Sequence, residues 1–215
     1  MALIDERTRE EVGRRLATLE VPVRLTLRHG GTGADDCPTC AASRELVETL
    51  GEIAPERVVV ELVELSQHSD LPQLEVSRPG EEARVVFQGL PSGFEFATLI
   101  DALERVGGVG PEFSSAAQGR IDQLDSDLEV TVFVTPSCPY CPSAASLANR
   151  LALSSKRVRA RTVEANEFPE LSERHGVRGV PHTVVNGSSA FVGALPEENF
   201  VERVLALAAS APVLS

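Results

Sequence analysis

The chain has 215 residues, of which 42% are apolar, and its formal net charge at pH 7 is −12. This length can hold one large domain or two domains of about 100 residues each. No run rich in Lys and Arg interrupts the acidic background, so nucleic acid and anionic membrane surfaces are not expected partners. The N-terminus reaches a charge at Asp5, and no stretch approaches the roughly 20 apolar residues of a membrane span, so we expect a cytoplasmic protein.

The first half predicts helices and strands arranged around a Cys-x-x-Cys motif. Asp5 is a suitable N-cap, and Val12, Leu16 and Leu19 recur at helical spacing, which indicates a first helix. The expected elements are a helix over 5–19, a strand from 21, a helix over about 40–50, strands at 57–63, 73–76 and 85–87, and a helix near 94–106. A strand, a helix and a second strand predict a parallel crossover, and the last two strands predict a hairpin.

The second half repeats this order. The expected elements are a helix around 117–124, a strand from 128, a helix over about 139–152, strands at 157–163, 182–185 and 190–192, and a helix over 197–209. Asn186-Gly187 is a strong signal for a type I′ hairpin turn. The chain therefore predicts an α/β fold made of two βαβ-ββα units, each with a mixed sheet flanked by helices.

The glycine and proline at 107–111 mark the boundary between residues 1–108 and 109–215. The stretch from Cys40 to Pro72 is about ten residues shorter than its counterpart in the second half. An extra helix is expected there around 167–175, and the first unit is expected to lack it.

Two Cys-x-x-Cys motifs contain every cysteine of the chain: Cys37-Pro38-Thr39-Cys40 and Cys138-Pro139-Tyr140-Cys141. In a reducing compartment such pairs are reactive dithiols or metal ligands rather than structural disulfides. A shared zinc site is the alternative. It is disfavoured because the pairs are about a hundred residues apart, whereas compact zinc modules space them by roughly 15 to 20.

The position of each motif before a helix predicts dithiol redox chemistry. With Pro139 in the first helical turn, free backbone N–H groups and the helix dipole would face the Cys138 sulfur and lower its pKa. Cys138, expected to be exposed, would attack a substrate disulfide, and the more buried Cys141 would resolve the mixed disulfide. The same roles are predicted for Cys37 and Cys40.

The second half closely resembles the tandem, glutaredoxin-like protein disulfide oxidoreductases, which contain two thioredoxin folds. The resemblance is carried by residues 132–142, 163–165, 180–181 and 193–197, and in the first half by residues 87–96. A neighbouring resemblance is to the N-terminal domain of the alkyl hydroperoxide reductase flavoprotein, in which only the second unit carries a working dithiol. Cys37 and Cys40 argue against that family as the first choice.

The resemblance implies further site residues. A cis proline beside each dithiol is expected at Leu71-Pro72 and at Val180-Pro181, and the backbone of Val180 would pair with an extended substrate. Tyr140, in a glutaredoxin-like Pro-Tyr pair, is expected on the substrate-binding surface.

The proton acceptor of the reaction is not given by the family pattern. Thioredoxins place a buried carboxylate six residues before the first cysteine, where this chain has Gly31 and Val132. Glu164, at the end of a strand, is the candidate, although glutamates at strand ends are mostly solvated. His182 follows the expected cis proline and is either a neighbour of the Cys138 sulfur or a partner for a backbone group.

The leading hypothesis is a thiol-disulfide oxidoreductase that reduces, forms or isomerises disulfides in protein substrates. No Gly-x-Gly-x-x-Gly follows a strand, so we expect no bound flavin or nicotinamide and only the redox-active disulfides. Electrons would come from a flavoprotein thioredoxin reductase. One alternative is an electron shuttle dedicated to a peroxiredoxin, and another is a scaffold that binds zinc.

Overall fold

The computed structural model of the chain describes residues 4–30, 37–66 and 70–210, so Gly31 and most of the glycine-rich loop before Cys37 lie outside the described residues. The first half contains α1 (Glu6–Leu16), β1 (Val23–His29), α2 (Cys40–Ile53), β2 (Val58–Glu64), β3 (Gln73–Ser77), β4 (Val85–Gln88) and α3 (Phe94–Val106). The second half contains α4 (Ser115–Ile121), β5 (Leu128–Val134), α5 (Cys141–Ser154), β6 (Val158–Glu164), α6 (Pro169–Arg174), β7 (His182–Val185), β8 (Ser189–Val192) and α7 (Glu197–Ser210). The predicted order of elements is confirmed in both halves.

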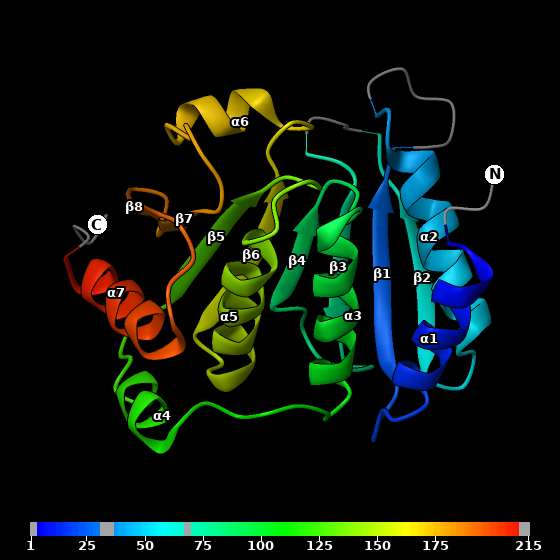
Figure 1. The fold of residues 1–215 in the computed structure, drawn as a ribbon, viewed down its shortest axis with the longest axis horizontal. Helices are drawn as coiled ribbons and strands as arrows, with labels where there is room; N and C mark the ends of the chain where they lie inside the picture. Colours follow the sequence, from blue (N-terminus) through cyan, green and yellow to red (C-terminus); the bar gives the residue numbers. More distant parts are fainter. Residues whose placement is uncertain (1–3, 31–36, 67–69, 211–215) are drawn as a thin grey trace.

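All eight strands form one continuous mixed sheet in the order β2-β1-β3-β4-β6-β5-β7-β8 (Figure 1). Within each half, the first strand pairs with a parallel strand on one side and an antiparallel strand on the other. The two halves meet where β4 pairs with β6 in parallel, from Val85 opposite Ala160 to Gln88 opposite Val163. This seam closes one edge of each half, because the outer strand of the first hairpin hydrogen-bonds to the second half.

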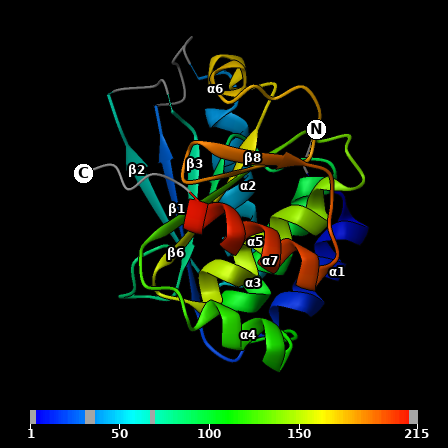
Figure 2. The same cartoon turned by 90° about the vertical axis from the view of Figure 1, so that its left-hand side faces the viewer.

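The helices pack against one face of this sheet, and α6 lies beyond the edge at which β5 and β6 end (Figures 1 and 2). The alternation along β1 explains the layering. Val23, Leu25 and Leu27 are fully buried, whereas Arg24 and Arg28 lie on the other face. On that face Arg28 pairs with Glu75 across β1 and β3, at 2.7 Å. Paired charges there are compatible with water, so the sheet needs a helical cover on one side only.

Local signals fix the ends of several helices. Asp5 caps α1 by accepting a hydrogen bond from the Thr8 N–H at 2.7 Å, as predicted. The predicted hairpin turn at Asn186-Gly187 has positive φ angles of 48° and 69°, as a type I′ turn requires. The first helix ends at Leu16 rather than at residue 19, because the chain turns there towards β1.

The predicted extra helix of the second half is α6, although it is shorter than the range 167–175. Between β2 and β3, the described residues 65, 66 and 70–72 form no helix. The proposed boundary at 107–111 falls in the connection between α3 and α4, and it stays a prediction because the two halves share one sheet. Within the described part of the chain, no helix is both long enough and apolar enough to cross a membrane.

Candidate active site

Both dithiols lie at the same edge of the sheet. The pairings make β1, β4, β5 and β6 parallel to one another, so their carboxyl ends share one edge, the upper edge in Figure 1. Cys37 follows β1 and Cys138 follows β5. The fold therefore presents two redox motifs on one side of a single sheet.

In the second unit, Cys138 and Cys141 form a disulfide across the start of α5. The helix begins at Cys141, so Pro139 lies in the preceding turn, and its predicted place in the first helical turn is wrong. The turn is closed by the Cys141 N–H, which lies 3.1 Å from the Cys138 Sγ and 3.4 Å from the Cys138 carbonyl oxygen. After reduction, this N–H and the helix dipole would stabilise a thiolate on Cys138.

The exposures of the two sulfur residues differ less than predicted. Cys138 is 8% exposed and Cys141 is fully buried, so the expected order is present but Cys138 is not an open nucleophile. Both cysteines belong to the main hydrophobic core, and Val180 packs against that core. Tyr140 is the accessible residue of the motif, with 69% of its surface exposed.

The first dithiol has a different environment. Cys37 and Cys40 form a disulfide and are 5% and 1% exposed. They make a small hydrophobic cluster with Leu71. Here the sulfur that accepts a backbone hydrogen bond is that of Cys40, from the Gly30 N–H at 3.3 Å. The contact that would favour a thiolate on the first cysteine of the motif is thus seen in the second unit.

The peptide bonds Leu71-Pro72 and Val180-Pro181 are both cis, as the resemblance implied. The surrounding contacts are also repeated. The Pro72 carbonyl oxygen accepts a hydrogen bond from Gly89 at 2.9 Å, and the Pro181 carbonyl oxygen accepts one from Gly193 at 2.8 Å. Among the described residues the backbone of Val180 makes no hydrogen bond, so it is available to an incoming strand.

Glu164 is buried but already engaged. Its carboxylate accepts hydrogen bonds from the Asn166 backbone N–H at 3.2 Å, the Asn166 side-chain amide at 2.8 Å and the Glu167 N–H at 2.6 Å. Burial raises the pKa of Glu164, while the donated hydrogen bonds oppose that increase. The side chain therefore holds the end of β6 in place, and its predicted role as proton acceptor stays a hypothesis.

Glu95 is a buried carboxyl group that sequence reasoning missed. It is 2% exposed, neither of its oxygens has a hydrogen-bond partner among the described residues, and burial raises its pKa to about 7. With Gln88, Thr162 and Glu164 it lines a cavity of about 10 Å³ between the two halves, which also adjoins Pro136 in the loop leading to Cys138.

A sequence signal for Glu95 existed. Its position continues the buried stripe of α3 formed by Leu99, Ala102, Leu103 and Val106, where an apolar residue is the normal choice. A carboxyl group on such a stripe is unusual enough to suggest a functional group.

His182 takes neither of its two expected roles. Its ring packs edge-on against Phe133, with the ring centres 6.3 Å apart, and neither ring nitrogen has a hydrogen-bond partner among the described residues. Burial lowers its pKa, so the neutral ring acts as part of the core.

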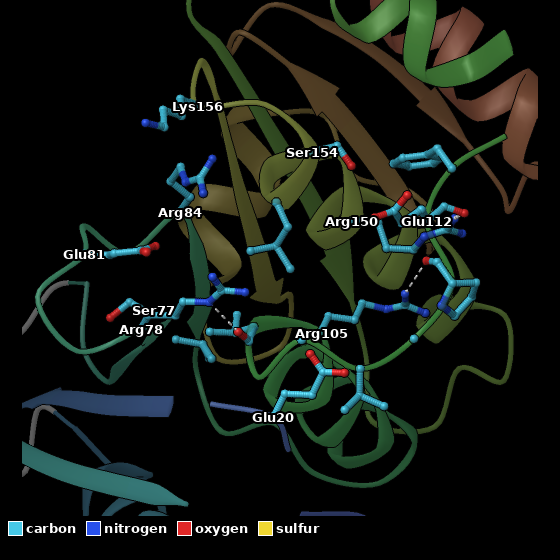
Figure 3. A pocket seen from close by; sticks show the side chains of 18 of the residues that line it. Glu20, Ser77, Arg78, Glu81, Arg84, Arg105, Glu112, Arg150, Ser154 and Lys156 are labelled. Carbon is cyan, nitrogen blue, oxygen red and sulfur yellow. Dashed lines mark hydrogen bonds between the residues drawn. The ribbon is translucent and has the colours of Figure 1, made fainter. Parts of the chain in front are cut away.

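A large groove of about 710 Å³ lies at the other edge of the sheet, away from the cysteines. Figure 3 shows that charged side chains of both signs line it, including Arg78, Arg84, Glu20 and Lys156. Arg105 donates there to the Pro111 carbonyl oxygen at 3.1 Å, which holds the connection between the halves. The groove therefore belongs to the junction and not to the redox site.

Potential metal ligands do not gather in the described residues, where no cluster of three or more His, Cys, Asp or Glu side chains is present. Each cysteine is instead bonded to its neighbour within its own motif. The cysteines of the two motifs thus act as two separate pairs.

Comparison with known proteins agrees with this geometry. Residues 128–206 match the family model described as Thioredoxin domain. The AhpF-type component of alkyl hydroperoxide reductase from Staphylococcus aureus is 28% identical over 172 residues, which cover 80% of this chain and 32% of that protein. The chain thus spans about a third of the length of the curated relatives that it matches.

Two solved structures match nearly the whole chain. A protein disulfide oxidoreductase from Aeropyrum pernix is 26% identical with a TM-score of 0.83, covering 95% of this chain and 94% of its own. The N-terminal N/C domain of alkylhydroperoxide reductase AhpF from Enterococcus faecalis is 19% identical with a TM-score of 0.83, covering 94% and 99%. The latter likeness shows the fold alone.

Proposed function

Because this chain is a tandem thioredoxin-fold oxidoreductase with a dithiol in each half, we propose that it reduces disulfides in protein substrates. The observation that carries the proposal is the second dithiol. Its first sulfur accepts the Cys141 N–H at 3.1 Å at the start of α5, next to the cis bond at Pro181 and an exposed Tyr140. This combines a stabilised thiolate with a docking surface for an extended chain.

The reaction begins from the reduced pair. The Cys138 thiolate attacks one sulfur of a substrate disulfide, forms a mixed disulfide and releases the other substrate sulfur as a thiolate. Cys141 then loses its proton and attacks the Cys138 sulfur. The second substrate thiolate leaves, and the Cys138–Cys141 disulfide is formed. Two electrons pass to the substrate, and a donor dithiol from a flavoprotein reductase restores the starting state.

The resolving step needs a group that accepts the Cys141 proton. Glu95 is our choice, because a carboxyl with a pKa of about 7 is half ionised near neutral pH and exchanges protons in both directions. Its cavity adjoins Val134 and Pro136, which lead from β5 to the motif. The polar cavity provides the path to Cys141 that we propose.

A second candidate function is favoured by the curated relatives. They are components of alkyl hydroperoxide reductase, so this chain would pass electrons from a flavoprotein reductase to a peroxiredoxin. The same second dithiol would serve, with a peroxiredoxin disulfide as its substrate. The first dithiol would then act as a relay or as a second site.

The test compares reduction of insulin disulfides, with dithiothreitol as donor, by three full-length proteins. Cys138→Ser/Cys141→Ser is expected to lose the activity, whereas its matched control Cys37→Ser/Cys40→Ser retains at least part of it. Full activity in the first variant would contradict the assignment of the second dithiol. Fast peroxide-dependent turnover with a peroxiredoxin and a flavoprotein reductase, together with poor insulin reduction, would instead support the shuttle.

A further inference from the structure

A carboxylate of the second half contacts the first dithiol motif. Glu167 follows β6 and is half-buried at the junction. Its Oε2 accepts a hydrogen bond from the Thr39 hydroxyl, and its Oε1 accepts one from the Leu90 N–H at 2.9 Å. Its own N–H donates to Glu164 at 2.6 Å. Glu167 therefore joins the end of β6 to two loops of the first half.

The junction is shaped to bring this carboxylate close. Gly89 has a φ of +96°, and a Cβ there would lie 2.8 Å from the Glu164 Cβ and 3.1 Å from the Glu167 Cδ. Any side chain at position 89 would force these groups apart. The glycine thus permits the close approach on which the Glu167 contacts depend.

Thr39 lies between the two cysteines and is the N-cap residue of α2. Threonine in that position usually caps its own helix, as Asp5 and Ser114 do in α1 and α4. Thr39 makes no such capping bond, and its hydroxyl points to Glu167 instead. Tyr140, at the same position of the second motif, is 69% exposed.

We propose that Glu167 is a positioning residue for the first dithiol, holding the Cys37–Cys40 turn through Thr39 and placing a negative charge beside it. The charge opposes the helix dipole of α2, which favours a thiolate on Cys37. A like charge nearby disfavours the ionised thiol and raises its pKa. The first dithiol would then be less reactive than the second near neutral pH, and its reactivity would depend on a residue of the other half.

Other charged groups surround the motif and stay constant in the comparison. His29 ends β1, Glu64 ends β2, and Asp70 precedes Leu71. Asp35 and Asp36 are next to Cys37 in the sequence but lie outside the described residues. Since none of these is altered, a difference between variants reports on the bridge alone.

The experiment measures the rate at which iodoacetamide modifies Cys37 between pH 5 and 10 in the reduced, full-length Cys138→Ser/Cys141→Ser protein, with the site quantified by mass spectrometry. Glu167→Gln keeps the size and the accepting oxygen but removes the charge. We expect it to lower the pKa of Cys37 by about one unit. At low pH the rate should rise about threefold, because tenfold more thiolate is partly offset by its lower nucleophilicity.

The matched control is Glu170→Gln, which removes the same charge from an exposed position on α6 and should leave the profile unchanged. Thr39→Val removes the donated hydroxyl but no charge, and it should shift the profile in the same direction as Glu167→Gln. An unchanged pKa in Glu167→Gln would overturn the electrostatic role, and an unchanged profile in Thr39→Val would overturn the positioning role.

The inference rests on the proposed reduction of Cys37 and Cys40, but alkylation detects the thiol without any substrate. Failure to reduce insulin would therefore count against the proposed function while leaving this test intact. Circular dichroism of each variant verifies that the fold is retained.

Discussion

Glu95→Gln should make the stability of the protein less sensitive to alkaline pH. In the folded protein, burial raises the pKa of Glu95 from 4.5 to about 7, whereas the unfolded chain exposes the group to water. Below pH 4.5 the carboxyl is protonated in both states. As the pH rises to about 7, the unfolded state loses the proton first, so ionisation favours unfolding and stability falls.

The magnitude follows from this difference in pKa. Each pKa unit corresponds to about 1.4 kcal/mol, so Glu95 should remove roughly 3 kcal/mol of stability between about pH 4.5 and 7.5. Glutamine cannot ionise and lacks this contribution. The free energy of unfolding of Glu95→Gln relative to the parent should therefore rise by roughly 3 kcal/mol over that interval. The absolute value at one pH is less informative, because the buried amide has its own desolvation cost.

The assay is urea unfolding followed by far-ultraviolet circular dichroism at several pH values, since the chain has no tryptophan and one tyrosine. Glu164 titrates in parent and variant alike, so its contribution cancels in the difference. Glu45→Gln, an exposed glutamate on α2, is the matched control and should show a difference that does not change with pH. A flat difference for Glu95→Gln as well would refute the argument that this carboxyl is held neutral by burial.

Two further outcomes are expected. Gly93→Ala should lower the melting temperature by roughly 5 to 10 °C in a thermal scan, because φ is +58° and a Cβ would lie 2.3 Å from the Pro136 carbonyl oxygen. Gly119→Ala, where no atom lies within 4 Å, should raise it slightly, and equal effects would contradict the packing argument. Peptide mapping of the reduced protein after brief iodoacetamide treatment should find label on Cys138 before Cys141, which is fully buried. Labelling in the reverse order would contradict the assignment of Cys138 as nucleophile.

Most of the fold was predictable because its signals are local. Hydrophobic spacing, the Asp5 cap, the Asn186-Gly187 turn and the two cysteine motifs each act within a few residues, and the structure contains every element that they predict. The matched prolines at 72 and 181 were also interpretable, because their positions repeat in the two halves. Bounds were less accurate, as at α5, where the turn before Cys141 delays the helix.

The junction could not be predicted from such signals. The β4–β6 seam joins strands of different halves, and nothing within either strand specifies its neighbour. Glu167 and Thr39 are 128 positions apart, and a half-buried glutamate after a strand gives no local sign of its partner. Glu95 was accessible to sequence reasoning, since it interrupts an apolar stripe, but its partners across the seam were not.

The seam between β4 and β6 also limits how the molecule can move. Hydrogen bonds cross it from residue 85 to 88, so the halves cannot swing apart like beads on a flexible string without breaking the sheet. The spacing between the two disulfides is then set by the width of the strands between them. A bulky protein docked on one of them obstructs access to the other from the same side. Donor and acceptor must therefore visit in succession, and steady-state turnover should follow ping-pong kinetics rather than pass through a ternary complex.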